Sequence, residues 1–98
     1  MTRLELATEL ADDIDRITTH LLGHEVSNVD ERIGEVLDAL AVLVRHPLIG
    51  RPAAQGRREL VIGRDARGYV ARYQFDAVRD TVVVIGLRAQ RELGFARD

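Results

Sequence analysis

In the first half of the chain, apolar residues recur every three or four positions, with charged residues between them. Such spacing places the apolar side chains on one face of a helix and the charged ones on the other. It predicts a first helix from about residue 6 or 7 to 22 and a second one that Ser27 or Asn28 caps. The second helix ends by about His46, because the residue before a proline disfavours the helical conformation. We therefore expect a helical hairpin over about residues 6–45.

From residue 58 onward, apolar residues alternate with polar ones or form short runs rich in valine, isoleucine and aromatic residues. This pattern predicts three β-strands joined by loops of hairpin length, at Arg58–Ile62, Tyr69–Phe75 and Thr81–Leu87. The last of them is apolar on both faces, as is typical of a central strand. Residues 46–57 contain both prolines and show no periodicity, which predicts a loop. In Thr2–Leu6 apolar and charged residues alternate, which predicts an optional extra strand.

Helices followed by strands are typical of an α+β fold, in which the hairpin packs on one face of the sheet. We expect a single domain over residues 1–98, with a small antiparallel sheet of three strands, or four with the N-terminal segment. The strands form a meander over residues 58–88, and residues 89–98 form a polar tail. The aromatic side chains expected to pack on the hairpin are those of Tyr69, Tyr73 and Phe75. The charged side chains of the first helix expected to face solvent are those of Asp12, Asp13, Asp15 and Arg16.

The net charge of −2 conceals an asymmetry between the two halves of the chain. Residues 1–44 carry ten carboxylates against three arginines, whereas residues 45–98 carry eleven arginines against six carboxylates. All fourteen basic residues are arginine, a bias that a GC-rich genome would also produce. A basic second half is suited to contact phosphates or an acidic partner.

The composition excludes several classes of site. The chain has no cysteine, which excludes disulfides, a thiolate nucleophile and any cysteine-ligated metal. His20 and His24 have the i, i+4 spacing of a helical metal pair, but no third ligand accompanies them, so we expect no metal site and no cofactor. The longest apolar runs have six residues, far below the ~20 needed to cross a bilayer, and no signal-like segment opens the chain. We expect a cytoplasmic protein with no membrane contact.

Five short segments of the second half stand out by their order and spacing. They are HPLIGRP at 46–52, RELVI at 58–62, GYVARY at 68–73, VVVI at 82–85 and LRAQRELGF at 87–95. Together with the acidic helical hairpin before them, they resemble the RelE/ParE superfamily of bacterial toxins, and the ParE-like branch most. The resemblance covers essentially the whole chain.

The resemblance implies the toxin half of a type II toxin–antitoxin pair. In such pairs an acidic, amphipathic C-terminal segment of the cognate antitoxin wraps the toxin, and two toxins with two antitoxins is the common hetero-oligomer. The antitoxin binds operator DNA, so the toxin meets that DNA only indirectly. Toxins of the ParE type act on DNA gyrase, whereas those of the RelE type cut messenger RNA in the ribosomal A site.

RNA cleavage needs a general base, cations for the phosphate and a proton donor. RelE-like enzymes use a cluster of lysine and arginine residues together with a tyrosine or histidine near the C-terminus. This chain has no lysine, and Phe95 and Ala89 stand where related toxins often carry tyrosine and histidine. Arg88 and Arg91 remain, and a guanidinium group stabilises a phosphate but does not serve as a base. The sequence therefore favours a mechanism of binding over an enzymatic one.

The candidate contacts to a target or an antitoxin are the arginines of the basic half and two apolar loop residues: Arg57, Arg58, Arg72, Arg88, Arg91, Leu48 and Ile49. Arg72 lies mid-strand, where its stem packs across an open sheet face or its head meets a partner. Arg57 lies near a turn, where a solvated arginine is the simpler interpretation. Leu48 and Ile49 either line a groove for an acidic amphipathic segment or plug one end of the core.

Two other functions stay open at this point. One is a RelE-type, ribosome-dependent messenger RNA endonuclease, with Arg88 and Arg91 at the phosphate and Glu59 as the base. The other is a toxin-like module without toxicity, which only binds the antitoxin and takes part in autoregulation of the operon.

Overall fold

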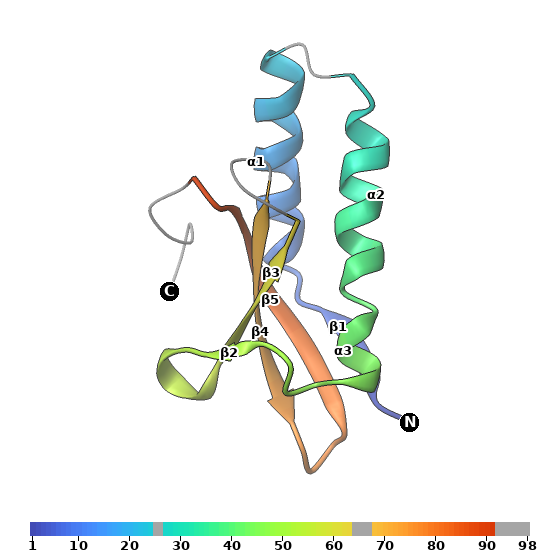
Figure 1. The fold of residues 1–98 in the computed structure, drawn as a ribbon, viewed down its shortest axis with the longest axis vertical. Coiled ribbons are helices and arrows are strands. Elements are labelled where there is room, and N and C mark those ends of the chain that lie inside the picture. Colours follow the sequence, from blue (N-terminus) through green and yellow to red (C-terminus); the bar gives the residue numbers. More distant parts are fainter. Residues whose placement is uncertain (25–26, 64–67, 92–98) are drawn as a thin grey trace.

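The computed structural model describes residues 1–24, 27–63 and 68–91, which form a layer of helices on one face of a β-sheet (Figure 1). The helices are α1 (Leu10–Gly23), α2 (Val29–Ala39) and α3 (Val42–Arg45), and η1 (Ala54–Gly56) is a short 3-10 turn. The strands are β1 (Arg3–Leu6), β2 (Arg51–Pro52), β3 (Arg58–Ile62), β4 (Tyr69–Asp76) and β5 (Thr81–Ala89). α1 and α2 lie side by side as the predicted hairpin, so the α+β class is confirmed. Most of the predicted tail, residues 92–98 with Phe95, lies outside the described residues.

The described strands form one five-stranded sheet in the order β1-β5-β4-β3-β2. The antiparallel meander β3-β4-β5 is confirmed, and β5 lies between two neighbours as its apolar character predicts. The optional N-terminal strand forms as β1, but it pairs parallel to β5, with Leu4 opposite Val82, which makes the sheet mixed. β2 is a further strand inside the predicted loop, where Arg51 and Pro52 pair with β3. A strand of two residues has no periodicity that a sequence pattern reveals.

Both long helices differ from their predicted spans. α1 begins only at Leu10 because the chain first continues along β5, where the Ala7 N–H donates to Val84 O at 2.9 Å. The second helix divides into α2 and α3, since around Leu40 two successive N–H groups donate to carbonyls three residues back, at 3.2 and 3.1 Å. These are the bonds of a tighter helical turn. Asn28 precedes α2 with φ 61°, and its side chain does not make the predicted capping hydrogen bond.

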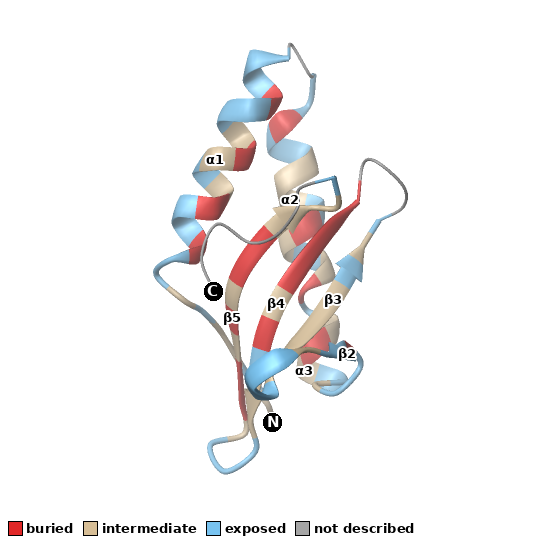
Figure 2. Ribbon diagram, turned by 90° about the vertical axis from the view of Figure 1, so that its left-hand side faces the viewer, coloured by how far each residue is buried: buried red, intermediate tan, exposed pale blue. Residues whose placement is uncertain are grey.

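The core lies between the hairpin and the helix-facing side of β4 and β5, whose buried residues are red in Figure 2. Its helical members are Leu10, Ile17, Leu21, Val29, Val36, Leu40 and Leu43. Its sheet members are Tyr69, Ala71, Tyr73, Val82, Val84 and Leu87. Phe75 packs against this cluster from a partly buried position. The predicted packing of the β4 aromatic residues on the hairpin is therefore confirmed.

A buried carboxylate on α1 holds the end of β5, which corrects the prediction that Asp13 faces solvent. β1 ends opposite Val84, so the outer edge of β5 beyond that point has no strand neighbour among the described residues. There the Leu87 N–H donates to Asp13 Oδ2 at 2.9 Å, and Arg16 Nη2 donates to Leu87 O at 3.2 Å. Asp13 is only 1% exposed and lies 3.8 Å from the Arg16 guanidinium. Two side chains of α1 thus bind the backbone of Leu87 where this edge of β5 has no neighbouring strand among the described residues.

Candidate functional site

The side of the sheet away from the helices carries a row of charged side chains across three strands. Arg51 of β2 pairs with Glu59 of β3, and Glu59 in turn pairs with Arg72 of β4. Cross-strand partners point to the same side of a sheet, and Arg72 alternates with the core residues Ala71 and Tyr73. The row therefore lies on the side of the sheet seen in front of α2 in Figure 2, which we call the open face.

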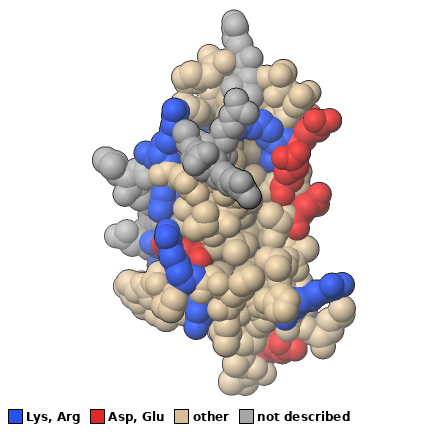
Figure 3. All heavy atoms as spheres, viewed as in Figure 1, with Lys and Arg blue, Asp and Glu red and all other residues tan. Residues whose placement is uncertain are grey.

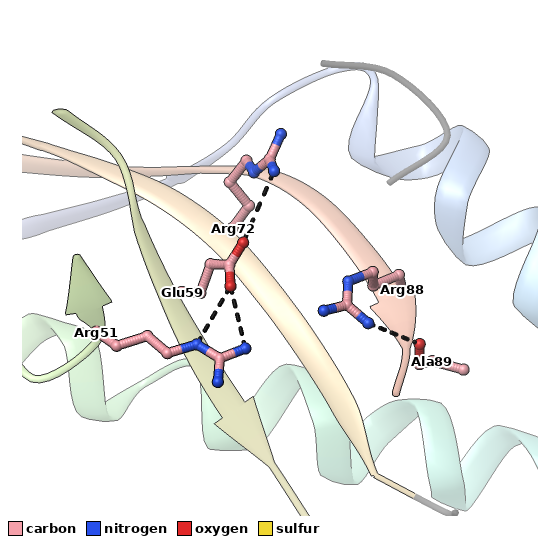
Figure 4. Close-up of polar contacts among 5 residues, drawn as sticks. All are labelled: Arg51, Glu59, Arg72, Arg88 and Ala89. Carbon is pink, nitrogen blue, oxygen red and sulfur yellow. Dashed lines mark hydrogen bonds and ion pairs between the residues drawn. The ribbon is translucent and has the colours of Figure 1, made fainter. Parts of the chain in front are cut away.

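Glu59 joins two arginines into the Arg51–Glu59–Arg72 cluster (Figure 4). Its Oε1 accepts from Arg51 Nε at 3.2 Å and from Arg51 Nη2 at 3.1 Å, and its Oε2 lies 3.7 Å from Arg72 Nη2. The Glu59 side chain is 15% exposed and that of Arg72 is 21% exposed, so this pair is largely shielded from water. Both carboxylate oxygens are engaged by guanidinium groups, and charge-assisted contacts of this kind orient all three side chains. Arg51 was not among the predicted contacts, because no pattern reveals the short strand that places it here.

Arg88 of β5 lies on the same open face, at the end of an apolar row. It pairs with Val70 of β4, which pairs with Val61 of β3, and Val61 is 44% exposed. Arg72 pairs with Gly86, two residues before Arg88, so the two arginines are diagonal neighbours. The Arg88 guanidinium donates to the carbonyl of the next residue at 3.3 Å (Figure 4). Among the described residues, this part of the open face thus combines the guanidinium groups of Arg51, Arg72 and Arg88 with the carboxylate of Glu59, a balance that attracts anions.

The predicted arginines do not gather at one place. Arg72 and Arg88 share the open face, whereas Arg58 projects from β3 on the helix-facing side. Arg57 is half-buried between η1 and β3, and Arg91 is exposed just past β5. Two of the five candidate arginines, Arg72 and Arg88, therefore lie on the open face.

Two loop residues before β2 form an exposed apolar surface, the Leu48–Ile49 patch. Leu48 is 58% exposed and Ile49 54% exposed, so they do not plug the core. The backbone beneath them is held by the sheet: the Gly50 N–H donates to the hydroxyl of the buried Tyr73 at 2.8 Å. Arg58 Nη1 donates to Leu48 O at 3.2 Å and to Gly50 O at 2.8 Å. Arg58 therefore binds the backbone of this loop through its guanidinium group.

The histidines lie apart from the open face. His20 and His24 occupy the end of α1, where both are exposed and their ring centroids lie 4.3 Å apart. His46 follows α3 and is exposed as well. Across residues 1–24, 27–63 and 68–91, no three histidine or carboxylate side chains converge as metal ligands. Over the same ranges, no helix has the length and apolar character needed to span a bilayer.

Removing the carboxylate of the cluster should strengthen its attraction for anions. In Glu59→Gln, the Arg51 and Arg72 guanidinium groups lose the charge that neutralises them, so we expect elution from heparin at a higher salt concentration. Glu5→Gln is the matched control, because Glu5 lies on the same side of the sheet and pairs with Arg3 at 3.8 Å. Equal shifts for the two variants would mean that net charge alone matters and would contradict a local anion site.

Comparisons with known proteins agree with this architecture. Among solved structures, a chain described as the chromosomal ParDE TA system from P. aeruginosa is similar, with a TM-score of 0.73 and 18% sequence identity. The alignment covers 91% of this chain and 96% of that chain, and at such identity the likeness concerns the fold. No curated protein matches. Residues 4–94 match the family model described as ParE toxin of type II toxin-antitoxin system, parDE, so this chain belongs to the ParE toxin family.

Proposed function

We propose that the protein is a ParE-like toxin that inhibits growth by binding a large target, DNA gyrase, rather than by cutting RNA. The family match over residues 4–94 carries this proposal. The arginines of the open face support binding as the mechanism, since a guanidinium group attracts anions but does not accept a proton. The carboxylate among them, Glu59, has both oxygens on guanidinium groups, which leaves it poorly placed to act as a general base. We place the protein in the cytoplasm, where gyrase acts.

A cognate antitoxin neutralises the toxin in this proposal. Support comes from the similar solved structure, which is described as a ParDE TA system. In Figure 3, basic side chains run along the side formed by the strands, with acidic atoms among them, whereas most of the acidic side chains lie on the side of α2. An acidic, amphipathic segment therefore finds cationic partners on one side of the chain and repulsion on the other. The complex is a hetero-oligomer that contacts operator DNA through the antitoxin alone.

Induced expression in a bacterial host tests whether the chain is toxic. We expect growth to stop when it is expressed alone and to continue when the antitoxin of the adjoining reading frame is co-expressed. Arg72→Ala should weaken the arrest, because it removes a cation from the open face. Arg79→Ala is the matched control, since this exposed arginine lies at the turn between β4 and β5. Normal growth with the wild-type chain alone would favour a module without toxicity.

A further inference from the structure

A pocket of about 680 Å³ lies between the first half of α2, the end of β3 and the start of β4, and we call it the α2 pocket. Its apolar part is formed by Val36 of α2, Ile62 of β3 and Tyr69 of β4. Ile62 and Tyr69 are cross-strand partners, so their side chains lie next to each other beneath the helix. A volume of this size is typical of sites that hold small organic molecules. The pocket shares no residue with the open face or with the Leu48–Ile49 patch.

Tyr69 brings a polar group to the apolar part of the α2 pocket. The residue is only 7% exposed, and within the described part of the chain no hydrogen bond engages its hydroxyl. Buried hydroxyl groups are ordinarily hydrogen-bonded, as that of Tyr73 in the same strand is to the Gly50 N–H at 2.8 Å. A buried tyrosine that lines a pocket without such a bond offers its hydroxyl to a ligand.

Two carboxylates lie at the mouth of the α2 pocket. Glu31 and Glu35 both line it, and both are exposed. Their i, i+4 spacing on α2 places their Cβ atoms about 5–6 Å apart on one face of the helix. Neither carboxylate forms an ion pair among the residues that the structure describes. Like charges at this spacing repel each other, so a cation placed between them removes a repulsion as well as adding an attraction.

Arg32 and the N-terminus of α2 would instead attract an anion, but the surrounding charges oppose one. The described lining has one arginine against two glutamates, with His24 beside them. The first turn of α2 carries Asp30 and Glu31, which already lie at the positive end of the helix dipole. Most of the acidic side chains in Figure 3 lie on this side of the molecule. The α2 pocket is therefore better suited to a cation.

We infer that the α2 pocket binds a small aliphatic diamine. One ammonium group lies between the carboxylates of Glu31 and Glu35, and the carbon chain packs on Val36 and Ile62. The second nitrogen donates a hydrogen bond to the Tyr69 hydroxyl. This inference goes beyond the proposed function and does not depend on it, because it needs neither a target nor an antitoxin.

Isothermal titration calorimetry of the full chain with putrescine, a four-carbon diamine, tests the inference. We expect saturable binding that weakens as the salt concentration rises. Glu31→Gln/Glu35→Gln should weaken it about 30-fold, because this variant loses both charges that hold the ammonium group. Asp30→Asn/Asp38→Asn is the matched control and should bind like wild type. Both aspartates are exposed on α2, neither lines the pocket, and the change in net charge is the same.

Butylamine, which lacks the second nitrogen of putrescine, isolates the contribution of Tyr69. Tyr69→Phe removes only the hydroxyl group and keeps the ring that packs in the core. It should weaken the binding of putrescine about fivefold and leave that of butylamine unchanged. Butyrate has the same chain length and an anionic head, and we expect it not to bind. An unchanged melting temperature of Tyr69→Phe checks that the variant is folded.

Four results would contradict the inference. The first is the absence of any heat of binding with putrescine. The second is equal affinity of the two double variants, because the charge of α2 as a whole would then attract the ligand. The third is tighter binding of butyrate than of butylamine, which would indicate an anion site at Arg32. The fourth is an equal effect of Tyr69→Phe on putrescine and butylamine, because the hydroxyl would then not contact the second nitrogen.

Discussion

Replacing Asp13 by alanine should lower the free energy of unfolding by about 3 kcal/mol. The loss has two parts, because the Leu87 N–H is left without its acceptor at a buried edge and Arg16 loses its carboxylate. Urea denaturation followed by circular dichroism measures the change. Asp13→Asn keeps an acceptor oxygen but not the charge, so its stability should fall between those of wild type and Asp13→Ala.

Asp15→Ala is the control for this prediction. Asp15 is exposed on the same helix, two residues from Asp13, and its removal should change stability by no more than about 0.5 kcal/mol. Equal urea concentrations at the unfolding midpoint for Asp13→Ala and Asp15→Ala would mean that α1 does not hold the edge of β5.

Gly50→Ala should lower the free energy of unfolding by nearly as much, about 2–3 kcal/mol. The added Cβ would lie 2.6 Å from Cε1 of the buried Tyr73 and 2.9 Å from the backbone oxygen of Glu59. Neither atom has room to move, since the ring is packed in the core and the oxygen belongs to β3. The loop must then lift from the sheet, so the melting temperature should fall.

Gly34→Ala is the matched control for the glycine at position 50. A Cβ at Gly34 meets nothing within 4 Å, and the residue lies inside α2. Alanine favours helix over glycine by about 1 kcal/mol, so this variant should be as stable as wild type or more stable. A Gly50→Ala protein with an unchanged melting temperature would contradict the close approach of loop and sheet.

The elements with strong periodicity could be predicted from the sequence. β3 has the predicted bounds, Arg58–Ile62, and β4 and β5 extend past theirs only to Asp76 and Ala89. When one face of a strand or helix is buried, apolar residues recur along it at a regular spacing. That spacing can be recognised from neighbouring residues of the sequence alone. The same reasoning assigned Tyr73 to the core, where it is fully buried.

The features that escaped prediction depend on partners distant in the sequence. Asp13 stands among exposed carboxylates, and only the free edge of β5, 74 residues further along, explains its burial. Arg51 lies on the open face because it belongs to β2, and this strand is too short to show an alternation of apolar and polar residues. The second helix is interrupted near Leu40, where the sequence has neither glycine nor proline. These two residues are the usual signs of a helix interruption in a sequence. The sequence named Arg72 and Arg88 as candidate contacts, but it did not indicate that Arg51 and Glu59 lie beside Arg72 on the open face.

The central claim is that this chain acts by binding a macromolecule. The most direct test adds the purified protein to DNA gyrase and, separately, to translating ribosomes. We expect the protein to inhibit DNA supercoiling by gyrase, the antitoxin to reverse that inhibition, and messenger RNA on translating ribosomes to stay intact. Unimpaired supercoiling, together with cuts in the ribosomal A site that Arg88→Ala abolishes, would contradict the claim.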